Sequence, residues 1–139
     1  MKYLLDTNVI SELVAKQPVA QVVTWIDNID DTQAYLSVIT IGEIKKGIEK
    51  LPDSARKERL REWLSDELIV RFSQRILAID FNVMLNWGNL VAMLEMKGRK
   101  LPAMDSLIAA VAIHGQLTLA TRNVNDFRDT GVTLINPWR

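Results

Sequence analysis

The sequence contains no cysteine and a single histidine, His114. Without cysteine the chain can form neither a disulfide nor a cysteine-based zinc site, and nothing in it points to an oxidising compartment. One histidine excludes a metal-free ribonuclease that uses a pair of histidines as general acid and general base. His114 itself lies near the end of an expected helix, where the helix dipole favours a structural role.

Net charge and long apolar runs are also absent. The 17 basic and 17 acidic residues balance, so no overall field attracts nucleic acid, and a polyanion has to be bound by local patches. No apolar run approaches the ~20 residues of a membrane span, and the N-terminus lacks a signal-peptide pattern. Neither GxSxG nor GxxxxGK[ST] occurs, so serine hydrolases and P-loop enzymes are not indicated. We expect a cytoplasmic protein with no membrane partner.

The length of 139 residues and the hydrophobic content of 48% suit a single domain, which we expect to span 1–139. Hydrophobic periodicity predicts strands at 2–5, 34–37, 75–79 and 117–120, with 133–135 as a candidate fifth. Helices are expected at 8–16, 54–65, 81–97 and 102–114. Two more are expected, one that begins at Pro18 and one that follows the strand at 34–37 and ends at Pro52. Gly98 and Gly115 are expected to end the last two helices in the left-handed conformation. Short apolar strands that alternate with helices predict an α/β three-layer sandwich around a mostly parallel sheet of four to five strands.

Acidic and amide side chains follow the expected strands. Asp6 ends the first strand, Glu43 lies in the helix after the second, and Asp105 lies in the first turn of the last long helix. Asn123 and Asp126 follow the fourth strand. Because sites of parallel sheets form beyond the carboxyl ends of the strands, we expect these five residues at one edge of the sheet.

Each of these residues also has a structural interpretation. Asp6 can cap the following helix, and Thr40-Ile-Gly-Glu43 matches a capping box in which Glu43 binds a backbone N–H. Asp105 suits the helix dipole, and Asp126 can be an ordinary loop acid. Three or four carboxylates at one edge nevertheless repel one another unless they are protonated, paired or bound to a metal. Oxygen ligands suit Mg²⁺ or Mn²⁺, which indicates metal-assisted hydrolysis of a phosphodiester.

Four segments resemble, in this order, the motifs of the PIN-domain family: LLDTNVISEL, SVITIGEIKKGI, PAMDSLIAA and LTLATRNVNDF. With its length and its terminal INPW, the chain is similar to the VapC toxins of bacterial type II toxin–antitoxin pairs, in particular the FitB-like ones. The resemblance implies a Mg²⁺-dependent endoribonuclease toxin, with Mn²⁺ as the alternative ion, that a cognate antitoxin inhibits. It assigns Asp6, Glu43 and Asp105 to the metal. Asn123 stands where the family often has an acid, and Asp126 is the candidate to supply that charge.

The resemblance also implies a mechanism and a set of supporting residues. A metal-activated water attacks phosphorus in line and leaves 5′-phosphate and 3′-hydroxyl ends. Thr7, Asn8 and Thr121 match polar positions that orient the acids or waters. Operator DNA is expected to be reached only through the antitoxin, since the chain contains no recognisable DNA-binding motif.

Two other functions stay open. The first is a non-catalytic regulatory partner of a DNA-binding antitoxin. The second is a phosphohydrolase with Asp6 as nucleophile, although such enzymes have Asp-x-Asp where this chain has Asp6-Thr7-Asn8. RNA cleavage that depends on Mg²⁺ and on Asp6 excludes the regulator, and a phosphoryl group trapped on Asp6 favours the phosphohydrolase.

The helix at 81–97 is apolar on two arcs, one around Val83 and Trp87 and one containing Phe81, Leu85 and Met96. So wide an apolar surface predicts burial both in the core and in a homodimer, with a deeply wrapped helix as the alternative. Several basic residues flank the acids and either steer phosphate or face solvent: Lys45, Lys46, Lys50, Lys97, Arg99, Lys100 and Arg122. The basic residues between 56 and 61 are expected to form a solvated helix face: Arg56, Lys57, Arg59 and Arg61.

Overall fold

The strand that precedes Asp6, β1 (Tyr3–Leu5), lies at the centre of a parallel sheet in the computed structural model, which describes residues 1–139. Leu4 and Leu5 are both fully buried, so this strand is apolar on both faces, as a central strand of a parallel sheet has to be. The strand order is β3-β2-β1-β4-β5, and every pair is parallel. The other strands are β2 (Ala34–Ser37), β3 (Ile76–Leu77), β4 (Thr118–Ala120) and β5 (Leu134–Ile135).

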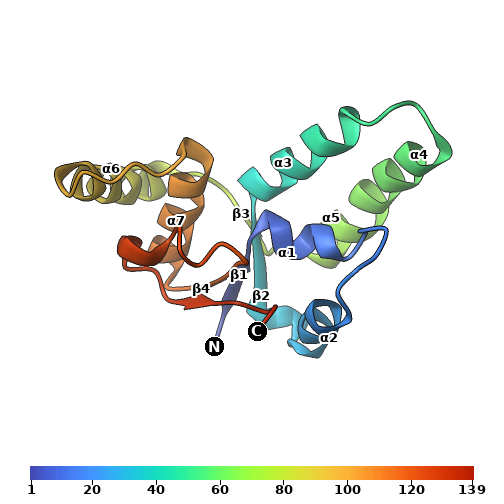
Figure 1. Ribbon diagram of the computed structural model, residues 1–139, viewed down its shortest axis with the longest axis horizontal. Helices are drawn as coiled ribbons and strands as arrows, with labels where there is room; N and C mark the ends of the chain where they lie inside the picture. Colours follow the sequence, from blue (N-terminus) through green and yellow to red (C-terminus); the bar gives the residue numbers. More distant parts are fainter.

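Helices cover both faces of the sheet and divide the core in two (Figure 1). Leu5 shares a core cluster with residues of α1 (Thr7–Glu12), α2 (Ala20–Asn28), α3 (Val38–Glu49) and α4 (Ala55–Glu62). Leu68 and Phe72, which flank the short α5 (Ile69–Arg71), belong to the same cluster. Leu4 packs with α6 (Phe81–Met96) and α7 (Ala103–Gly115) on the other face. The predicted three-layer α/β sandwich is therefore confirmed. None of the helices is both long and apolar enough to cross a membrane.

Short helical segments complete the chain. A π-helix, η2 (Trp63–Leu68), joins α4 to α5, so the helix expected to end at 65 continues to Arg71. Two 3₁₀ turns, η1 (Asp31–Gln33) and η3 (Arg128–Thr130), precede β2 and β5. The observed strands and helices otherwise lie within a few residues of the expected ranges.

Two expected helix ends are wrong. The capping box at Thr40 and Glu43 does not form, because α3 begins earlier, at Val38, where the Ser37 hydroxyl accepts the N–H of Thr40 at 3.2 Å. Glu43 therefore lies in the second turn with its carboxylate available to other groups. Gly98 does end α6 with φ 73°, but the left-handed residue after α7 is Gln116, at φ 55°, and not Gly115.

The expectation for Lys57 is also wrong, because this residue is buried and does not belong to a solvated helix face. Its Nζ donates to the carbonyl oxygens of Glu49 and Leu51 at 3.2 and 3.0 Å. It also lies 3.4 Å from Asp53, which is almost fully exposed and contributes little. The ammonium group thus satisfies carbonyl groups left free at the end of α3 and fixes the turn into α4.

Candidate active site

The strand order reverses between β1 and β4, and the candidate site lies beyond the carboxyl ends of these two strands, as expected for an open parallel sheet. Asp6 follows β1 directly, and its backbone N–H continues the ladder to the carbonyl of Ala120 at 2.9 Å. Its side chain is only 5% exposed. A carboxylate is thus fixed at the centre of the carboxyl edge by the backbone of the sheet itself.

Both carboxylate oxygens of Asp6 accept hydrogen bonds. Oδ1 accepts the N–H of Thr7 and Oδ2 accepts the hydroxyl of Thr121, each at 2.8 Å. Burial raises the pKa of Asp6, and the charge of Glu43 raises it further, while the bonds from Thr121 and Thr7 oppose the rise. Asp6 therefore caps α1, as its structural interpretation proposed, and also faces the candidate site.

Glu43 is oriented by a chain of hydroxyl groups. The Thr7 hydroxyl donates to Oε1 of Glu43 at 2.6 Å and lies 3.0 Å from the hydroxyl of Thr40. Because the Thr7 proton is used on Glu43, the Thr40 hydroxyl has to be the donor in the second bond. The Ser37 hydroxyl follows at 3.5 Å, and both Thr40 and Ser37 are buried. The position of Glu43 thus depends on residues at the end of β2.

Asp105 lies in the first turn of α7 and is half-buried. Burial raises the pKa of Asp105 to about 6, with further contributions from the charges of Asp6, Glu43 and Asp126. Four carboxylates from four separate segments are therefore close enough to repel one another. No cation relieves this repulsion, because none of the lysine and arginine ion pairs involves Asp6, Glu43 or Asp105.

Asn123 and Asp126 lie in the loop after β4, and both are exposed. The N–H of Asn123 donates to the Thr121 hydroxyl, and the N–H of Asp126 donates to the carbonyl of Asn123, both at 3.0 Å. Arg99 donates to the carbonyl of Asp126 at 3.1 Å. The loop is thus tied to the residue that binds Asp6, and its two candidate side chains remain free to turn toward the acids.

Asn8 joins the two halves of the site. Its amide nitrogen donates to the Thr121 hydroxyl at 3.4 Å, and its oxygen accepts the N–H of Arg122 at 3.3 Å. The polar residues singled out from the sequence, Thr7, Asn8 and Thr121, therefore all contact site residues or one another. Thr40 and Ser37 were not recognised from the sequence. A hydroxyl residue one helical turn before an acid was the only pattern that pointed to this role, and it predicts a helix N-cap equally well.

The residues fit a divalent cation by their chemistry. No three of the carboxylates converge in the geometry of ligands around an ion. All donors are nevertheless oxygens, as Mg²⁺ and Mn²⁺ prefer, and the raised pKa of Asp105 marks negative charge that a cation would neutralise. Asp6, Glu43 and Asp105 supply such oxygens at the carboxyl edge of the sheet.

Most basic residues near the site are already engaged. Lys45 pairs with Glu49 at 2.9 Å, and Arg99 pairs with Asp129 at 2.6 Å. The guanidinium of Arg122 lies 5.3 Å from the centre of the Trp138 ring. Lys46 and Lys50, by contrast, make no ion pair and line a cavity together with Glu43.

Relatives of this sequence carry names that fit such a site. The chain is 38% identical over 135 residues to the plasmid stability protein StbB of Pseudomonas syringae, covering 97% of each protein. It is 37% identical to Toxin FitB of Neisseria gonorrhoeae, again with 97% of each covered. It is 33% identical to the VapC ribonuclease Y4jK of Sinorhizobium fredii, with 97% of this chain and 96% of the relative covered.

Several solved structures also share the fold of this chain. FitAcB from Neisseria gonorrhoeae superposes with a TM-score of 0.95 at 36% identity over 99% of both chains. FitAB bound to the IR36 DNA fragment gives 0.94 at 35% identity, over 99% of this chain and 96% of that one. A toxin–antitoxin complex from Klebsiella pneumoniae gives 0.69 at 26% identity over 98% of both. The PIN domain model matches residues 3–132, and the chain therefore belongs to the PIN-domain family.

Proposed function

We propose that this protein is a Mg²⁺-dependent endoribonuclease toxin, with Mn²⁺ as the alternative ion, and that residues 1–139 act as one domain. The observation that carries the proposal is the gathering of Asp6, Glu43 and Asp105 at the carboxyl edge, where burial and the neighbouring charges raise the pKa of Asp105. The relatives named toxin and ribonuclease support the same activity. The single histidine excludes a metal-free route that uses a pair of histidines as acid and base.

In this mechanism Asp6, Glu43 and Asp105 hold the ion. When bound, the ion would lower the pKa of a water, orient it toward phosphorus and stabilise the leaving oxygen. Thr121 and Thr7 favour the ionised form of Asp6 and fix its side chain through their 2.8 Å bonds, and Thr7 also fixes Glu43. Asn123 and Asp126 complete the site from the exposed loop, Asn123 with a neutral oxygen and Asp126 with a charge.

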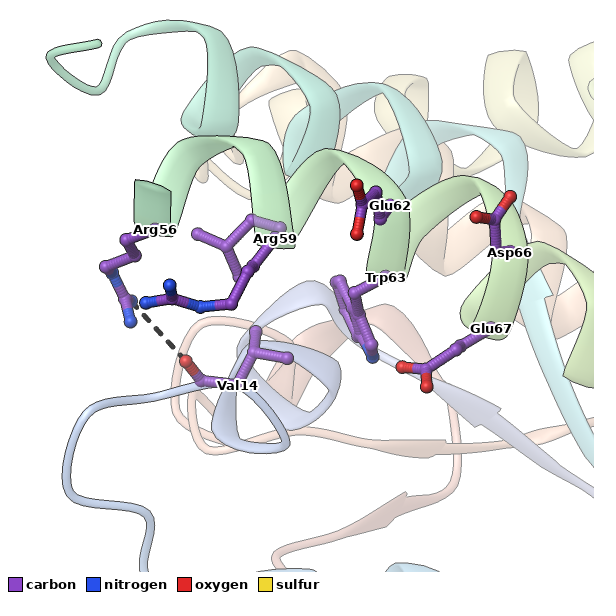
Figure 2. Close-up of a pocket in the computed structure, with 8 residues that line it drawn as sticks. Val14, Arg56, Arg59, Glu62, Trp63, Asp66 and Glu67 are labelled. Atoms are coloured by element: carbon purple, nitrogen blue, oxygen red, sulfur yellow. Dashed lines mark hydrogen bonds between the residues drawn. The ribbon is translucent and has the colours of Figure 1, made fainter. Parts of the chain in front are cut away.

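An antitoxin is the proposed inhibitor, and operator DNA is reached only through it. A cavity of about 500 Å³ lies between α4 and η2 on one side and the end of α1 on the other (Figure 2). Val14 and Trp63 give it an apolar floor, and Arg56 donates to the carbonyl of Val14 at 3.4 Å. Ile10 of α1 is fully buried in the core and does not line this cavity. The cavity has an arginine end, with Arg56 and Arg59, and an acidic end that suits a basic part of an antitoxin segment (Figure 2). The acidic end is formed by Glu62, Asp66 and Glu67.

A homodimer is the proposed assembly, in the cytoplasm. Val83 and Leu90 bury one arc of α6 against α7, while Phe81 is 75% and Met96 is 88% exposed. Leu85 is also exposed on this helix. The uncovered arc supports a contact between copies of the chain.

The test of the activity is RNA cleavage by the purified protein in Mg²⁺, Mn²⁺ or EDTA. We expect cleavage with either metal, 5′-phosphate product ends, and loss of activity in Asp6→Asn, Glu43→Gln and Asp105→Asn. Circular dichroism checks that each variant keeps the fold. Undiminished cleavage by pure Asp6→Asn protein contradicts the metal mechanism, and inactivity of the wild type with intact antitoxin binding favours the regulatory partner instead.

A further inference from the structure

A cavity of about 690 Å³ lies beside Glu43, between α3 and the first turns of α7. Figure 1 shows these two helices rising on opposite sides of the same edge of the sheet. Thr7 and Glu43 form the end of the cavity that adjoins the candidate active site. The walls are aliphatic, with Val38 and Ile39 on α3 facing Met104 and Leu107 on α7. The volume is in the range of small-molecule sites.

The α3 wall is built from residues at helical spacing, and its centre lacks a side chain. Val38, Gly42, Lys46 and Lys50 follow one another at intervals of four and lie on one ridge of the helix. A Cβ at Gly42 would meet nothing within 4 Å. Glycine destabilises a helix interior relative to alanine, so packing does not require it here. Its effect is to keep the cavity open next to Glu43.

The rim of the cavity carries positive charge that the protein does not neutralise. Lys46 and Lys50 are exposed and make no ion pair, whereas their neighbour Lys45 pairs with Glu49. Two free cations one helical turn apart, beside an aliphatic cavity, complement a flexible chain that carries apolar faces and regularly spaced negative charges. Single-stranded RNA has this character, because its bases insert among apolar side chains while its phosphates bind lysines.

We propose that this cavity is a nucleobase subsite for the RNA substrate. One base lies between Val38 and Met104 over Gly42, and Lys46 and Lys50 bind the adjoining phosphates. The neighbouring phosphodiester is thereby held next to Glu43. The subsite rests on the proposed ribonuclease function and adds to it the element that selects which bond of a single strand enters the site.

The first experiment fills the cavity. Gly42→Leu is compared with Gly42→Ala, which adds a single Cβ where nothing lies within 4 Å and so leaves most of the cavity open. Binding of a fluorescent ten-nucleotide single-stranded RNA is measured with Mg²⁺ in an Asp6→Asn background. We expect Gly42→Leu to weaken binding roughly fivefold, the lower end of the range for loss of one stacked base because the cavity walls are aliphatic, and Gly42→Ala to leave it nearly unchanged. Removing single bases from the RNA should weaken its binding to the Asp6→Asn protein at one position of the strand. In the protein that also carries Gly42→Leu, removing the base at that position should have no further effect.

The second experiment does not depend on filling the cavity and so stands even where Gly42→Leu fails to fold. Changing both Lys46 and Lys50 to Gln should reduce the slope of log affinity against log salt by about 1.4, at ~0.7 for each phosphate of a single strand. Lys45→Gln should leave the slope unchanged.

The outcomes separate the subsite from the function. RNA cleavage by the wild type, with equal RNA affinity in Gly42→Leu and Gly42→Ala and an unchanged salt slope in the lysine pair, overturns the subsite and leaves the ribonuclease intact. If Asp6→Asn protein does not bind RNA and the wild type does not cleave it, both the subsite and the ribonuclease are overturned. A changed sedimentation coefficient in Gly42→Leu with unchanged RNA affinity assigns the cavity to a contact between copies of the chain, and the nucleobase assignment is then wrong.

Discussion

The hydroxyl of Thr7 donates a 2.6 Å hydrogen bond to the carboxylate of Glu43, and so joins the first turn of α1 to the second turn of α3. Thr7 also donates its backbone N–H to Asp6 at 2.8 Å. One residue therefore sets the relative position of two of the three proposed metal ligands. Thr40, one step further along the hydroxyl chain, fixes the direction in which Thr7 donates.

Removing the hydroxyl of Thr40 should displace Glu43 through Thr7, although Thr40 makes no hydrogen bond to Glu43 itself. Thr40→Val keeps the shape of a side chain that is 1% exposed, but it leaves Thr7 without a donor. We expect a loss of ~1 kcal/mol in the free energy of unfolding and roughly tenfold weaker metal binding or activity, measured by urea unfolding, calorimetry and RNA cleavage. Thr40→Ser should restore metal binding. If Thr40→Val binds Mg²⁺ as the wild type does, the hydroxyl chain does not position Glu43.

The pH dependence of stability should report the repulsion around Asp105. Its pKa, about 6, lies above the ordinary value of 3.8, so the ionised form destabilises the fold. The metal-free protein should therefore gain stability as the pH falls from 7 through 6 toward 4. Asp105→Asn should raise stability at pH 7 by roughly 1 kcal/mol, after allowance for solvent screening, and this difference should disappear below pH 4. Thermal melts in EDTA provide the measurement.

The matched control for that experiment is Asp27→Asn, which neutralises an exposed acid on α2, remote from the site. It should leave the difference between pH 4 and pH 7 unchanged. If the wild type and Asp105→Asn show the same change in stability between pH 4 and pH 7, some other group neutralises the charge of the acids.

The loop after β4 should reveal which side chain completes the site. If Asn123 only positions a water, Asn123→Ala reduces cleavage less than Asp105→Ala does. If Asp126 supplies the charge that the family often places at position 123, Asp126→Asn requires more Mg²⁺ for half-maximal activity. A superimposable Mg²⁺ titration for wild type and Asp126→Asn removes Asp126 from the site.

The layers and the parallel direction of the strands could be predicted from the sequence because they depend on the local pattern of apolar residues. Leu4 and Leu5, buried on opposite faces, require a central strand, and a central parallel strand requires helices on both sides. The same reasoning places Asp6 and Asp105 correctly, since each follows from an element end.

Features that depend on contacts between distant segments were not predictable in this way. Lys57 stands in a run of alternating charges, and only the turn back from α3 brings carbonyl groups to it. The role of Thr40 likewise requires Thr7, 33 positions away. Local chemistry pointed to a cap at Thr40, but Ser37 is the residue that caps α3, which begins at Val38.

Self-association through α6 is open to a direct test. Phe81 and Leu85 are exposed on the arc that faces away from α7, so a charge there costs the monomer little. We expect the wild type to sediment as a dimer at micromolar concentration and Phe81→Glu with Leu85→Glu to sediment as a folded monomer. Lys97→Glu, an exposed change just beyond the end of the helix, serves as the control. A monomeric wild type contradicts the proposed assembly.

Mg²⁺ and the antitoxin should compete for the same charge position. The acids Asp6, Glu43 and Asp105 store like-charge repulsion that any entering cation relieves, and a ligand that binds only the folded state stabilises it, by ~2.7 kcal/mol at 100 times its Kd. Mg²⁺ should therefore raise the Tm of the wild type more than that of Asp6→Asn.

An antitoxin segment that crosses the cavity at Val14 and Trp63 passes within reach of the acids, because a third, smaller cavity joins these two residues to Thr7 and Glu43. We predict that this segment places an Arg or Lys among them. Saturating Mg²⁺, at constant ionic strength, should then weaken antitoxin binding in the wild type and have little effect in Asp6→Asn. Calorimetry at matched ionic strength measures both. If Mg²⁺ leaves the affinity of the wild type unchanged, no cation is inserted, and inhibition has to come from blocking the path of RNA to the site.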